Sequence, residues 1–340
     1  METITIKADS GPSRILIGER LENLQRYVPE AKLIVITDVN VGKLYPLDSM
    51  AADVVTIGTG EAIKTLDTVR DIYARLISSG ADRSAFIVGV GGGIVCDITG
   101  FAASTFLRGV RFGFVATTLL AQVDASVGGK NGVNYEGYKN MVGLFHQPEF
   151  VICDPELLKT LPRKEISCGL AEIVKHAAIA DADLFAYLEK HAEDILALDR
   201  RAIEKLVRVS VRIKSAIVSR DETEKGMRRL LNFGHTFGHA IEKVAGVPHG
   251  EAVSMGMVIA SALSVQKGLL SAQEDQRLRA VLNNLKLPTR IAENSSKITE
   301  AIAKDKKRAG DRIHFVLLNG IGTARVDQLS MKEIEGALNE

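Results

Sequence analysis

The sequence has almost no excess of charge and no long apolar segment. Its 340 residues include 43 basic and 42 acidic side chains, a formal net charge of +1. A nearly neutral chain carries no electrostatic signature of binding to nucleic acid or to an anionic membrane surface. No apolar run approaches the about 18 residues that a membrane span requires. The first residues, METITIKADSG, lack the apolar core of a signal peptide and alternate as a strand does.

Cysteine is also scarce. Cys96, Cys153 and Cys168 are an odd number, lie far apart and form no CxxC pair. This usage indicates a reducing compartment and argues against a zinc-finger framework. Apolar residues make up 46% and charged residues 25%, which excludes a disordered or collagen-like chain. At about 150 residues per domain, the length predicts two domains. We therefore expect a cytoplasmic globular protein of two domains.

The first half of the sequence alternates short apolar runs with helical patterns. Helices are predicted at 62–79 and from about 97 to 107, and strands at 32–38, 53–60, 84–90, 112–118 and 150–154. Strands that alternate with helices imply right-handed crossovers and a mostly parallel, Rossmann-like sheet. Such a sheet binds ligands at the carboxyl ends of its strands.

The second half is mainly helical, from residue 166 to about 285. The stretch 206–214 alternates with period two, as a half-buried strand would, but its apolar residues also fit one helix face, and its helical neighbours favour a helix. Residues 312–326 form two apolar runs around a glycine turn, which predicts a hairpin. We place the domain boundary near residue 160, with an α/β domain over 1–160 and a mainly α-helical domain over 161–340.

A glycine run, GVGGGIVCD (89–97), follows a predicted strand and opens a helix. Glycines there let phosphates approach the backbone, where the N–H groups of a helix N-terminus bind them. The spacing departs from GxGxxG because Ile94 occupies the place of the last glycine. The run therefore fits a dinucleotide pyrophosphate site, and it also fits a tight strand-to-helix turn without a ligand.

Three of the seven histidines lie within 15 residues. His235 and His239 share one helix face, and His249 follows after a short break. Two imidazoles and a carboxylate, with an open position, are typical of a catalytic divalent-metal site. The spacing leaves open which two histidines are ligands. Glu172, in an otherwise apolar helix, is a candidate acidic ligand, or else a solvated partner of a neighbouring cation.

Several cations and amides accompany these motifs. GGKNGVNYEGYKN (128–140) is expected to be a loop with two lysines, and lysines on such loops commonly bind phosphate. Taken singly, each of these residues also fits a solvated surface position. Taken together they favour an anionic substrate. Besides the two lysines of this loop, the set comprises Arg108, Lys214, Arg228 and Asn232.

These strings resemble the 3-dehydroquinate synthase family of the sugar phosphate cyclase superfamily, from about residue 30 to 325. They occur in the order and spacing of the family: GEAIK (60–64), GGGIVCDITGFAASTFLRG (91–109), TTLLAQVDASVGGK (117–130), KNMVG (139–143), GLAEIVKHA (169–177), RRLLNFGHTFGHAIE (228–242) and HGEAVSMGM (249–257). The sequence departs from the family pattern at Cys96, at Asn131 and in the turn at 135–138.

The resemblance implies an NAD site, a divalent-metal site and a substrate site. NAD contacts would fall on Gly91, Gly92, Gly93 and Asp97, with Asp38, Asn40, Glu61, Lys64, Thr117, Thr118, Lys130, Lys139 and Thr160. A zinc or cobalt ion would be held by Glu172, His235 and His249. The substrate site would comprise His239, Arg108, Asp124, Lys130, Asn140, Lys175, Lys214, Arg228 and Asn232. The arginine matching Arg108 reaches a neighbouring subunit in the family, so a homodimer is expected.

The implied reaction belongs to the shikimate pathway of aromatic amino acid biosynthesis. It converts 3-deoxy-arabino-heptulosonate 7-phosphate to 3-dehydroquinate and phosphate by NAD-dependent oxidation, phosphate elimination, reduction and intramolecular aldol closure. The alternatives are a sister cyclase acting on sedoheptulose 7-phosphate or glucose 6-phosphate, a glycerol-dehydrogenase-like oxidoreductase, and a non-catalytic NAD-binding or scaffold protein. Lys214, Arg228 and Asn232 together favour the dehydroquinate branch.

Overall fold

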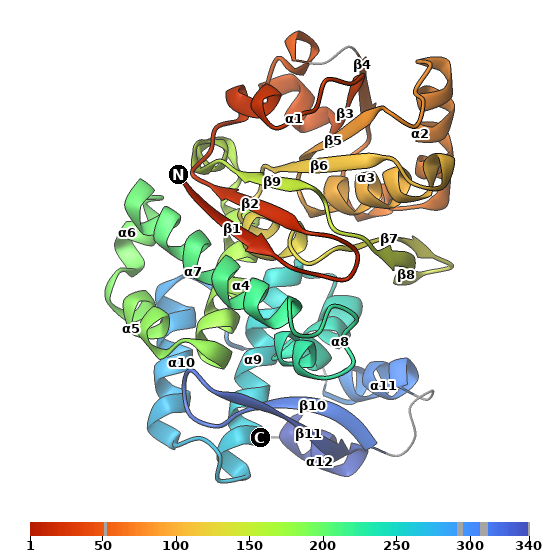
Figure 1. Cartoon of the computed structure of the whole chain (residues 1–340). Helices are drawn as coiled ribbons and strands as arrows, with labels where there is room; N and C mark the ends of the chain where they lie inside the picture. Colours follow the sequence, from red (N-terminus) through yellow and green to blue (C-terminus); the bar gives the residue numbers. More distant parts are fainter. Residues whose placement is uncertain (51–52, 291–294, 307–311, 339–340) are drawn as a thin grey trace. The chain divides into compact units, whose positions relative to one another are not determined.

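The computed structural model describes residues 1–50, 53–290, 295–306 and 312–338 (Figure 1). The chain forms two compact units. The first unit comprises Met1–Leu161 and Lys214–Thr223, and the second comprises Pro162–Ile213 and Glu224–Glu340. The segment Lys214–Thr223 therefore belongs to the first unit, although the residues on both sides of it belong to the second.

A seven-stranded sheet forms the centre of the first unit. All neighbouring strands are parallel except the first pair, in the order β1 (Glu2–Ile6), β2 (Ser13–Ile17), β9 (Phe150–Cys153), β6 (Arg111–Ala116), β5 (Phe86–Gly91), β3 (Leu33–Asp38) and β4 (Asp53–Ile57). The predicted mostly parallel sheet is confirmed. Its central strands are continuous apolar runs because helices cover both faces of a parallel sheet. The rings of Phe86 and Phe150 stack in its core with centroids 5.7 Å apart.

Helices and short turns connect these strands: η1 (Leu21–Arg26), α1 (Val39–Leu44), η2 (Leu47–Ser49), η3 (Glu61–Ile63), α2 (Leu66–Ser78), α3 (Gly93–Thr105), η4 (Phe106–Arg108), η5 (Ala121–Ala125) and η6 (Pro155–Thr160). Helix α2 begins later than predicted because Thr65 caps it, accepting a hydrogen bond from the N–H of Thr68. Its buried face, Val69, Ile72 and Leu76, has the spacing that predicted the helix.

The predicted loop over 128–140 is wrong. From Lys130 on, its residues belong to an antiparallel hairpin of β7 (Lys130–Tyr135) and β8 (Tyr138–Phe145). Glu136 and Gly137, with φ of 47° and 79°, form a two-residue turn in which both central residues have positive φ. This turn matches the twist of antiparallel strands. The glycines and polar residues of the segment hid its strand character.

The second unit is mainly helical, as expected: α4 (Arg163–Ala180), α5 (Ala182–Lys190), α6 (Ala192–Leu196), α7 (Arg200–Val218), η7 (Met227–Asn232), α8 (His235–Ala245), α9 (His249–Gln266), α10 (Ala272–Asn284), α11 (Ser295–Lys306) and α12 (Met331–Leu338). The last residues of α7, from Lys214, belong to the first unit. The ambiguous stretch 206–214 is helical, and the predicted tail hairpin is confirmed as β10 (Arg312–Leu318) and β11 (Ala324–Ser330).

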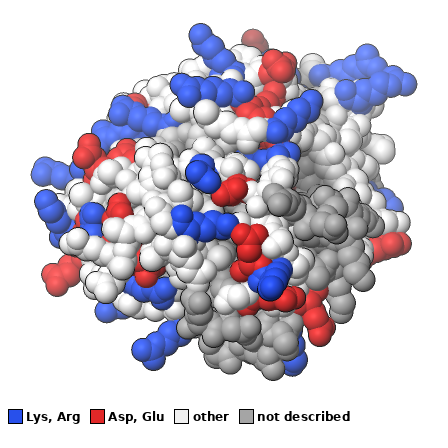
Figure 2. Space-filling view, turned by 90° about the horizontal axis from the view of Figure 1, so that it is seen from below, with Lys and Arg blue, Asp and Glu red and all other residues white. Residues whose placement is uncertain are grey.

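The balanced charge of the sequence is visible on the surface. On the face drawn in Figure 2, basic and acidic side chains of the described residues are interspersed. Among those residues, no helix is both long and apolar enough to cross a membrane.

Candidate active site

A carboxylate and two imidazoles converge in the second unit. Glu172 lies on α4, His235 is the first residue of α8, and His249 is the first residue of α9. The Nε2 atoms of His235 and His249 lie 3.4 and 3.3 Å from the same oxygen, Oε1 of Glu172. Candidate ligand atoms of the three residues all lie within 4.8 Å of one another. We call these residues the Glu–His–His cluster.

Close helix packing brings the three residues of this cluster together. A Cβ on Gly250 of α9 would lie 2.3 Å from Cα of Cys168 on α4. A Cβ on Gly256 would lie 2.0 Å from the carbonyl oxygen of Gly234, directly before α8. No real side chain tolerates these distances, so glycine lets both neighbouring segments approach α9. The backbone spacing at α9 thus sets where the ligand-bearing residues meet.

The histidines of this cluster are oriented through their second ring nitrogens. Nδ1 of His235 lies 3.2 Å from the carbonyl oxygen of Phe233, and Nδ1 of His249 lies 3.5 Å from Oε2 of Glu242. An Nδ1–H donated to such an oxygen leaves the Nε2 lone pair directed at the centre. Metal-binding histidines are usually held in this way. The donor set and its outer partners therefore fit a divalent metal ion.

The charges around Glu172 favour its ionised form. Its side chain is 0% exposed, and it forms a buried ion pair with Lys175, one turn along α4. Burial raises the pKa of Glu172, but the charges of Lys175 and His235 outweigh it, and the pKa lies well below the usual range. Burial lowers the pKa of His249, but hydrogen bonds to Glu172 and Glu242 outweigh this effect and raise it to about 9. The pair of Glu172 and Lys175 is thus buried, not solvated.

Three further candidate residues lie in the second unit. The His239 ring lies beside the cluster, with its centroid 5.3 Å from that of His235 and 6.2 Å from that of His249. Arg228 is 2% exposed on η7, which contacts the helix of Glu172. Nδ2 of Asn232 donates a 2.6 Å hydrogen bond to Oε1 of Glu224. A buried arginine beside a metal-binding helix suits an anionic ligand.

In the first unit, the glycine run joins β5 to α3. Gly91 ends the strand, Gly92 is the N-cap residue, and Gly93 begins the helix. A Cβ on Gly92 would lie 2.9 Å from Cγ2 of Thr118, so the close turn itself favours glycine. No side chain caps the helix at Gly92, and N–H groups at such a helix start are suited to phosphate. The glycine run can therefore be both a tight strand-to-helix turn and a site for a dinucleotide pyrophosphate.

The predicted residues next to this loop lie where parallel strands end. Asp38 ends β3 and Thr117 follows β6, the two neighbours of β5, so both lie at the same sheet edge as Gly91. Asp38 also caps α1, accepting hydrogen bonds from the N–H groups of Asn40 and Val41. This edge is the one where a doubly wound sheet binds a nucleotide.

Lys64 joins two sets of predicted residues. Its side chain is buried; its Nζ atom forms an ion pair with Asp97 and donates a hydrogen bond to Oδ1 of Asn140. Burial raises the pKa of Asp97, an effect that Lys64 offsets only in part. The structure thus brings two expected cofactor residues into contact with an expected substrate residue.

Asn134, which the sequence analysis missed, holds this part of the hairpin. Its Oδ1 accepts a 2.9 Å hydrogen bond from the N–H of Asn140, and its Nδ2 donates a 2.8 Å bond to Glu61. Its own N–H donates a 2.8 Å bond to the carbonyl oxygen of Lys64. Asn140 has a φ of 53°, which few residues other than glycine adopt. Asn134 was not identifiable from local sequence because each of its partners depends on tertiary folding.

Several other predicted residues of the first unit form contacts of their own. Nζ of Lys214 forms a buried ion pair with Asp124 and donates a 2.6 Å bond to its carbonyl oxygen. Thr160 shares a 3.0 Å hydrogen bond with the Tyr45 hydroxyl, and Thr118 accepts one from the N–H of Ala121. The exposed residues of the predicted set include Arg108, with φ of 68°, Lys130 and Lys139.

The fold is that of the sugar phosphate cyclases. A 2-deoxy-scyllo-inosose synthase in complex with carbaglucose-6-phosphate, NAD+ and Co2+ matches with a TM-score of 0.89 and 27% identity, over 99% of each chain. The 2-epi-5-epi-valiolone synthase of Streptomyces hygroscopicus subsp. jinggangensis, with NAD+ and Zn2+ bound, matches with a TM-score of 0.85 and 30% identity, over 96% of this chain and 95% of the other. A probable glycerol dehydrogenase from Sinorhizobium meliloti, 16% identical with a TM-score of 0.66, shares the fold alone.

Sequence comparison identifies the family within this class. Residues 54–168 match the model of the 3-dehydroquinate synthase N-terminal region, and residues 169–308 match that of its C-terminal region. The 3-dehydroquinate synthase of Geobacter metallireducens is 45% identical over 85% of this chain and 83% of its own length. That of Acetivibrio thermocellus is 43% identical, over 84% and 82%. The chain is an enzyme of the 3-dehydroquinate synthase family.

Proposed function

We propose that this enzyme converts 3-deoxy-arabino-heptulosonate 7-phosphate to 3-dehydroquinate and phosphate. The observation that carries the proposal is the Glu–His–His cluster, with a fully buried Glu172, in a chain 45% identical to a 3-dehydroquinate synthase. The sister cyclases that share the fold are less similar, at 27% and 30% identity. The difference in identity favours the heptulosonate over sedoheptulose 7-phosphate or glucose 6-phosphate as substrate.

The enzyme uses NAD and one divalent metal ion, zinc or cobalt. Solved relatives with the same fold contain NAD+ together with Co2+ or Zn2+. When bound, the metal would act as a Lewis acid on substrate oxygens, and the nicotinamide would accept a hydride and later return it. Residues 1–160 would bind NAD, and residues 161–340 would bind the metal and most of the substrate.

Within this proposal the side chains bind and orient. Glu172, His235 and His249 hold the metal, and Lys175 keeps Glu172 ionised through their ion pair. Arg228 and Lys214 suit the anionic groups of the substrate, because buried cations bind phosphate and carboxylate strongly. The remaining substrate residues are Arg108, Asp124, Lys130, Asn140, Asn232 and His239. The NAD residues are Asp38, Asn40, Glu61, Lys64, Gly91, Gly92, Gly93, Asp97, Thr117, Thr118, Lys130, Lys139 and Thr160.

Two further parts of the proposal concern the oligomeric state of the enzyme and the compartment in which it acts. A homodimer would let Arg108, exposed at the end of η4, contribute to a neighbouring subunit's site. The reaction would take place in the cytoplasm, in the synthesis of aromatic amino acids. Sedimentation of the purified enzyme tests the dimer, and mixing Arg108→Ala subunits with Lys175→Met subunits tests whether sites are shared. Shared sites would regain activity on mixing, whereas separate sites would not.

Phosphate release from the heptulosonate phosphate tests the reaction. The assay contains catalytic NAD and zinc or cobalt, with and without a chelator. Equal amounts of phosphate and dehydroquinate, no net NADH and loss of activity on chelation are the expected results. Turnover of sedoheptulose 7-phosphate or glucose 6-phosphate in place of the heptulosonate would reassign the enzyme to a sister cyclase. Net NADH production would instead indicate a dehydrogenase.

A further inference from the structure

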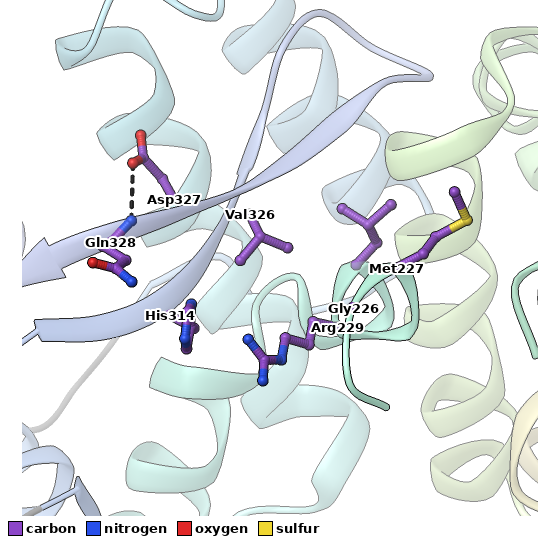
Figure 3. Close-up of a pocket in the computed structure, with 8 residues that line it drawn as sticks. Gly226, Met227, Arg229, His314, Val326, Asp327 and Gln328 are labelled. Atoms are coloured by element: carbon purple, nitrogen blue, oxygen red, sulfur yellow. Dashed lines mark hydrogen bonds between the residues drawn. The ribbon is translucent and has the colours of Figure 1, made fainter. Parts of the chain in front are cut away.

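A pocket of about 630 Å³ opens on the second unit, between η7 and the hairpin of β10 and β11 (Figure 3). Met227 and Arg229 contribute from η7, His314 from β10, and Val326 and Gln328 from β11. None of the three residues of the Glu–His–His cluster lines it. The pocket has the volume of a small-molecule site, which is typically about 300–1,000 Å³.

Two nitrogen-rich side chains, those of Arg229 and His314, face this pocket. Figure 3 shows the guanidinium group of Arg229 extending toward His314. Among the residues that the structure describes, neither side chain has a hydrogen bond or an ion pair. Arg229 is half-buried and permanently charged, and the His314 ring carries an N–H donor in either protonation state. An arginine so placed gains from an anionic partner, which none of the described residues supplies.

Among the described residues of the lining, the one acidic side chain is that of Asp327, and it is already neutralised. Oδ2 of Asp327 lies 2.8 Å from Nη2 of Arg325, and Oδ1 accepts a 2.8 Å hydrogen bond from the N–H of Gln328. Both interactions lower the pKa of Asp327. The ion pair with Arg325 therefore balances the charge of Asp327. The pocket keeps an excess of hydrogen-bond donors, from Arg229, His314 and the Gln328 amide.

The rest of the lining is apolar. Met227, Leu230 and Val326 form it, and the Met227 side chain is 42% exposed although it is large and hydrophobic. Convergent donors beside an apolar wall are typical of sites for a ligand with one anionic end and one apolar end. An inorganic anion would use only the donor side.

We propose that this pocket is a second anion site, which binds a small carboxylate or phosphate ester with an apolar body. The proposal stands apart from the cyclase reaction. It nevertheless bears on regulation, because two consecutive residues of η7 belong to different sites. Arg229 faces the pocket, and the buried Arg228 belongs to the proposed substrate site. A ligand that holds Arg229 would stabilise one position of the segment that carries Arg228.

The sequence contains no tryptophan, which allows a site-specific reporter. Met227→Trp places the sole indole at the pocket, and Tyr135→Trp places a control indole on the hairpin of the first unit. Fluorescence is titrated with cyclohexanecarboxylate, cyclohexyl phosphate and neutral cyclohexanol. We expect both anions to change the Met227→Trp signal in a saturable way, and cyclohexanol to bind about tenfold more weakly or worse, the loss of one charged hydrogen bond. The Tyr135→Trp signal should stay constant.

Substitutions in the reporter background locate the contact. Arg229→Gln and His314→Gln should each weaken the binding of both anions about tenfold. Arg83→Gln, at an exposed arginine of the first unit, should leave it unchanged. Equal affinity for cyclohexanol, or no effect of Arg229→Gln, overturns the proposal. Calorimetry on the unmodified enzyme repeats the titration without the reporter, and absence of binding there also overturns it.

A further experiment distinguishes binding in this pocket from binding in the proposed active site. Binding to the reporter should persist in Met227→Trp combined with His249→Asn, a variant expected to be inactive. Loss of binding in that variant would assign the anions to the active site and overturn the second site. Because no turnover is measured, the result does not depend on which sugar phosphate the enzyme uses.

Discussion

The two groups of candidate residues differ in how the chain holds them. In the second unit, Glu172, His235 and His249 converge inside packed helices, and a buried lysine compensates the carboxylate. In the first unit, Asn140 and Lys139 lie on a hairpin strand. The N–H of Asn140 donates a hydrogen bond to Oδ1 of Asn134, and its Oδ1 accepts one from Nζ of Lys64. Packing fixes the first group, whereas individual polar contacts fix the second. Substitutions should therefore act through metal binding and stability in one unit and through positioning in the other.

The largest effect is expected from His249→Asn. Asparagine removes the Nε2 atom that faces Glu172, so metal retention and turnover should be lost. Removal of a residue that orients a metal ligand typically lowers metal affinity about 10–100-fold, and His249→Asn should lower it more. Glu242→Gln, which changes the partner of His249 Nδ1, is the variant for this comparison. Metal content after dialysis and the phosphate assay measure both. His191→Asn, in the same unit but outside the cluster, is the control, and a His249→Asn enzyme with full activity and no metal would exclude the metal mechanism.

A difference in stability should separate the two buried ion pairs. Lys175→Met removes the largest compensating charge of the fully buried Glu172 and leaves it only the two histidines, which costs up to about 3–5 kcal/mol in the metal-free enzyme. Lys64→Met should cost less, since the Asp97 side chain is 20% exposed and its raised pKa eases protonation. Urea unfolding with chelator measures both, with the exposed Lys159→Met as control. Added zinc should restore part of the Lys175→Met loss, and equal losses in both variants would contradict the comparison.

Substitution of Asn134 tests whether this side chain positions Asn140, with no change of a buried charge. Asn134→Ala removes the acceptor for the N–H of Asn140 and the donor to Glu61, so kcat/KM should fall about tenfold with little change in melting temperature. Asn134→Asp keeps the acceptor and should retain more activity. Asn284→Ala, at an exposed position of α10, is the control. A loss of kcat/KM that follows only a loss of folded protein would reduce Asn134 to a structural role.

The smallest effect concerns the segment Lys214–Thr223. Glu222 accepts hydrogen bonds from Ser10 and from the N–H of Asp9. Burial raises its pKa, but these bonds and one from Gln147 outweigh that effect and lower it. A lowered acid pKa gives stability that is present above the unfolded value of about 4.3 and is lost as pH falls through the folded value.

Glu222→Gln should therefore lower the free energy of unfolding at pH 7 by about 1 kcal/mol or less, because the side chain is only partly buried and solvent screens its charge. The melting temperature should fall slightly as a result. The difference from the unmodified enzyme should shrink as the pH falls below about 4.3 and should vanish once the pH lies below the lowered pKa of Glu222. Melting curves between pH 3 and 8 measure it. A difference that persists at pH 3 would mean that packing, not charge, holds this segment.

The sheet of the first unit was predictable from sequence because its strands are apolar and end at glycine or aspartate. The hairpin of β7 and β8 was not, since Gly132 and Gly143 interrupt its alternation and its pairing is specified by the turn at Glu136 and Gly137. Local periodicity reports the faces of single elements. It does not report which polar segments pair with each other.

The metal site shows a similar division. The histidine cluster and Glu172 were visible as candidates, but spacing did not choose between His239 and His249; the family resemblance supplied that choice. The choice depends on where α8 and α9 begin and on how closely they pack. Asn134 left no local signal, because its partners are up to 73 residues away.

The close packing at Gly250 and Gly256 has a consequence for protein engineering and for natural variation. Since even one methyl group would collide with backbone at either position, no gradual series of larger residues leads away from this arrangement. A metal centre of this kind cannot be transplanted by copying its three ligands onto another helical scaffold. The donor scaffold must supply the interhelical distance first, and the ligands then follow from it.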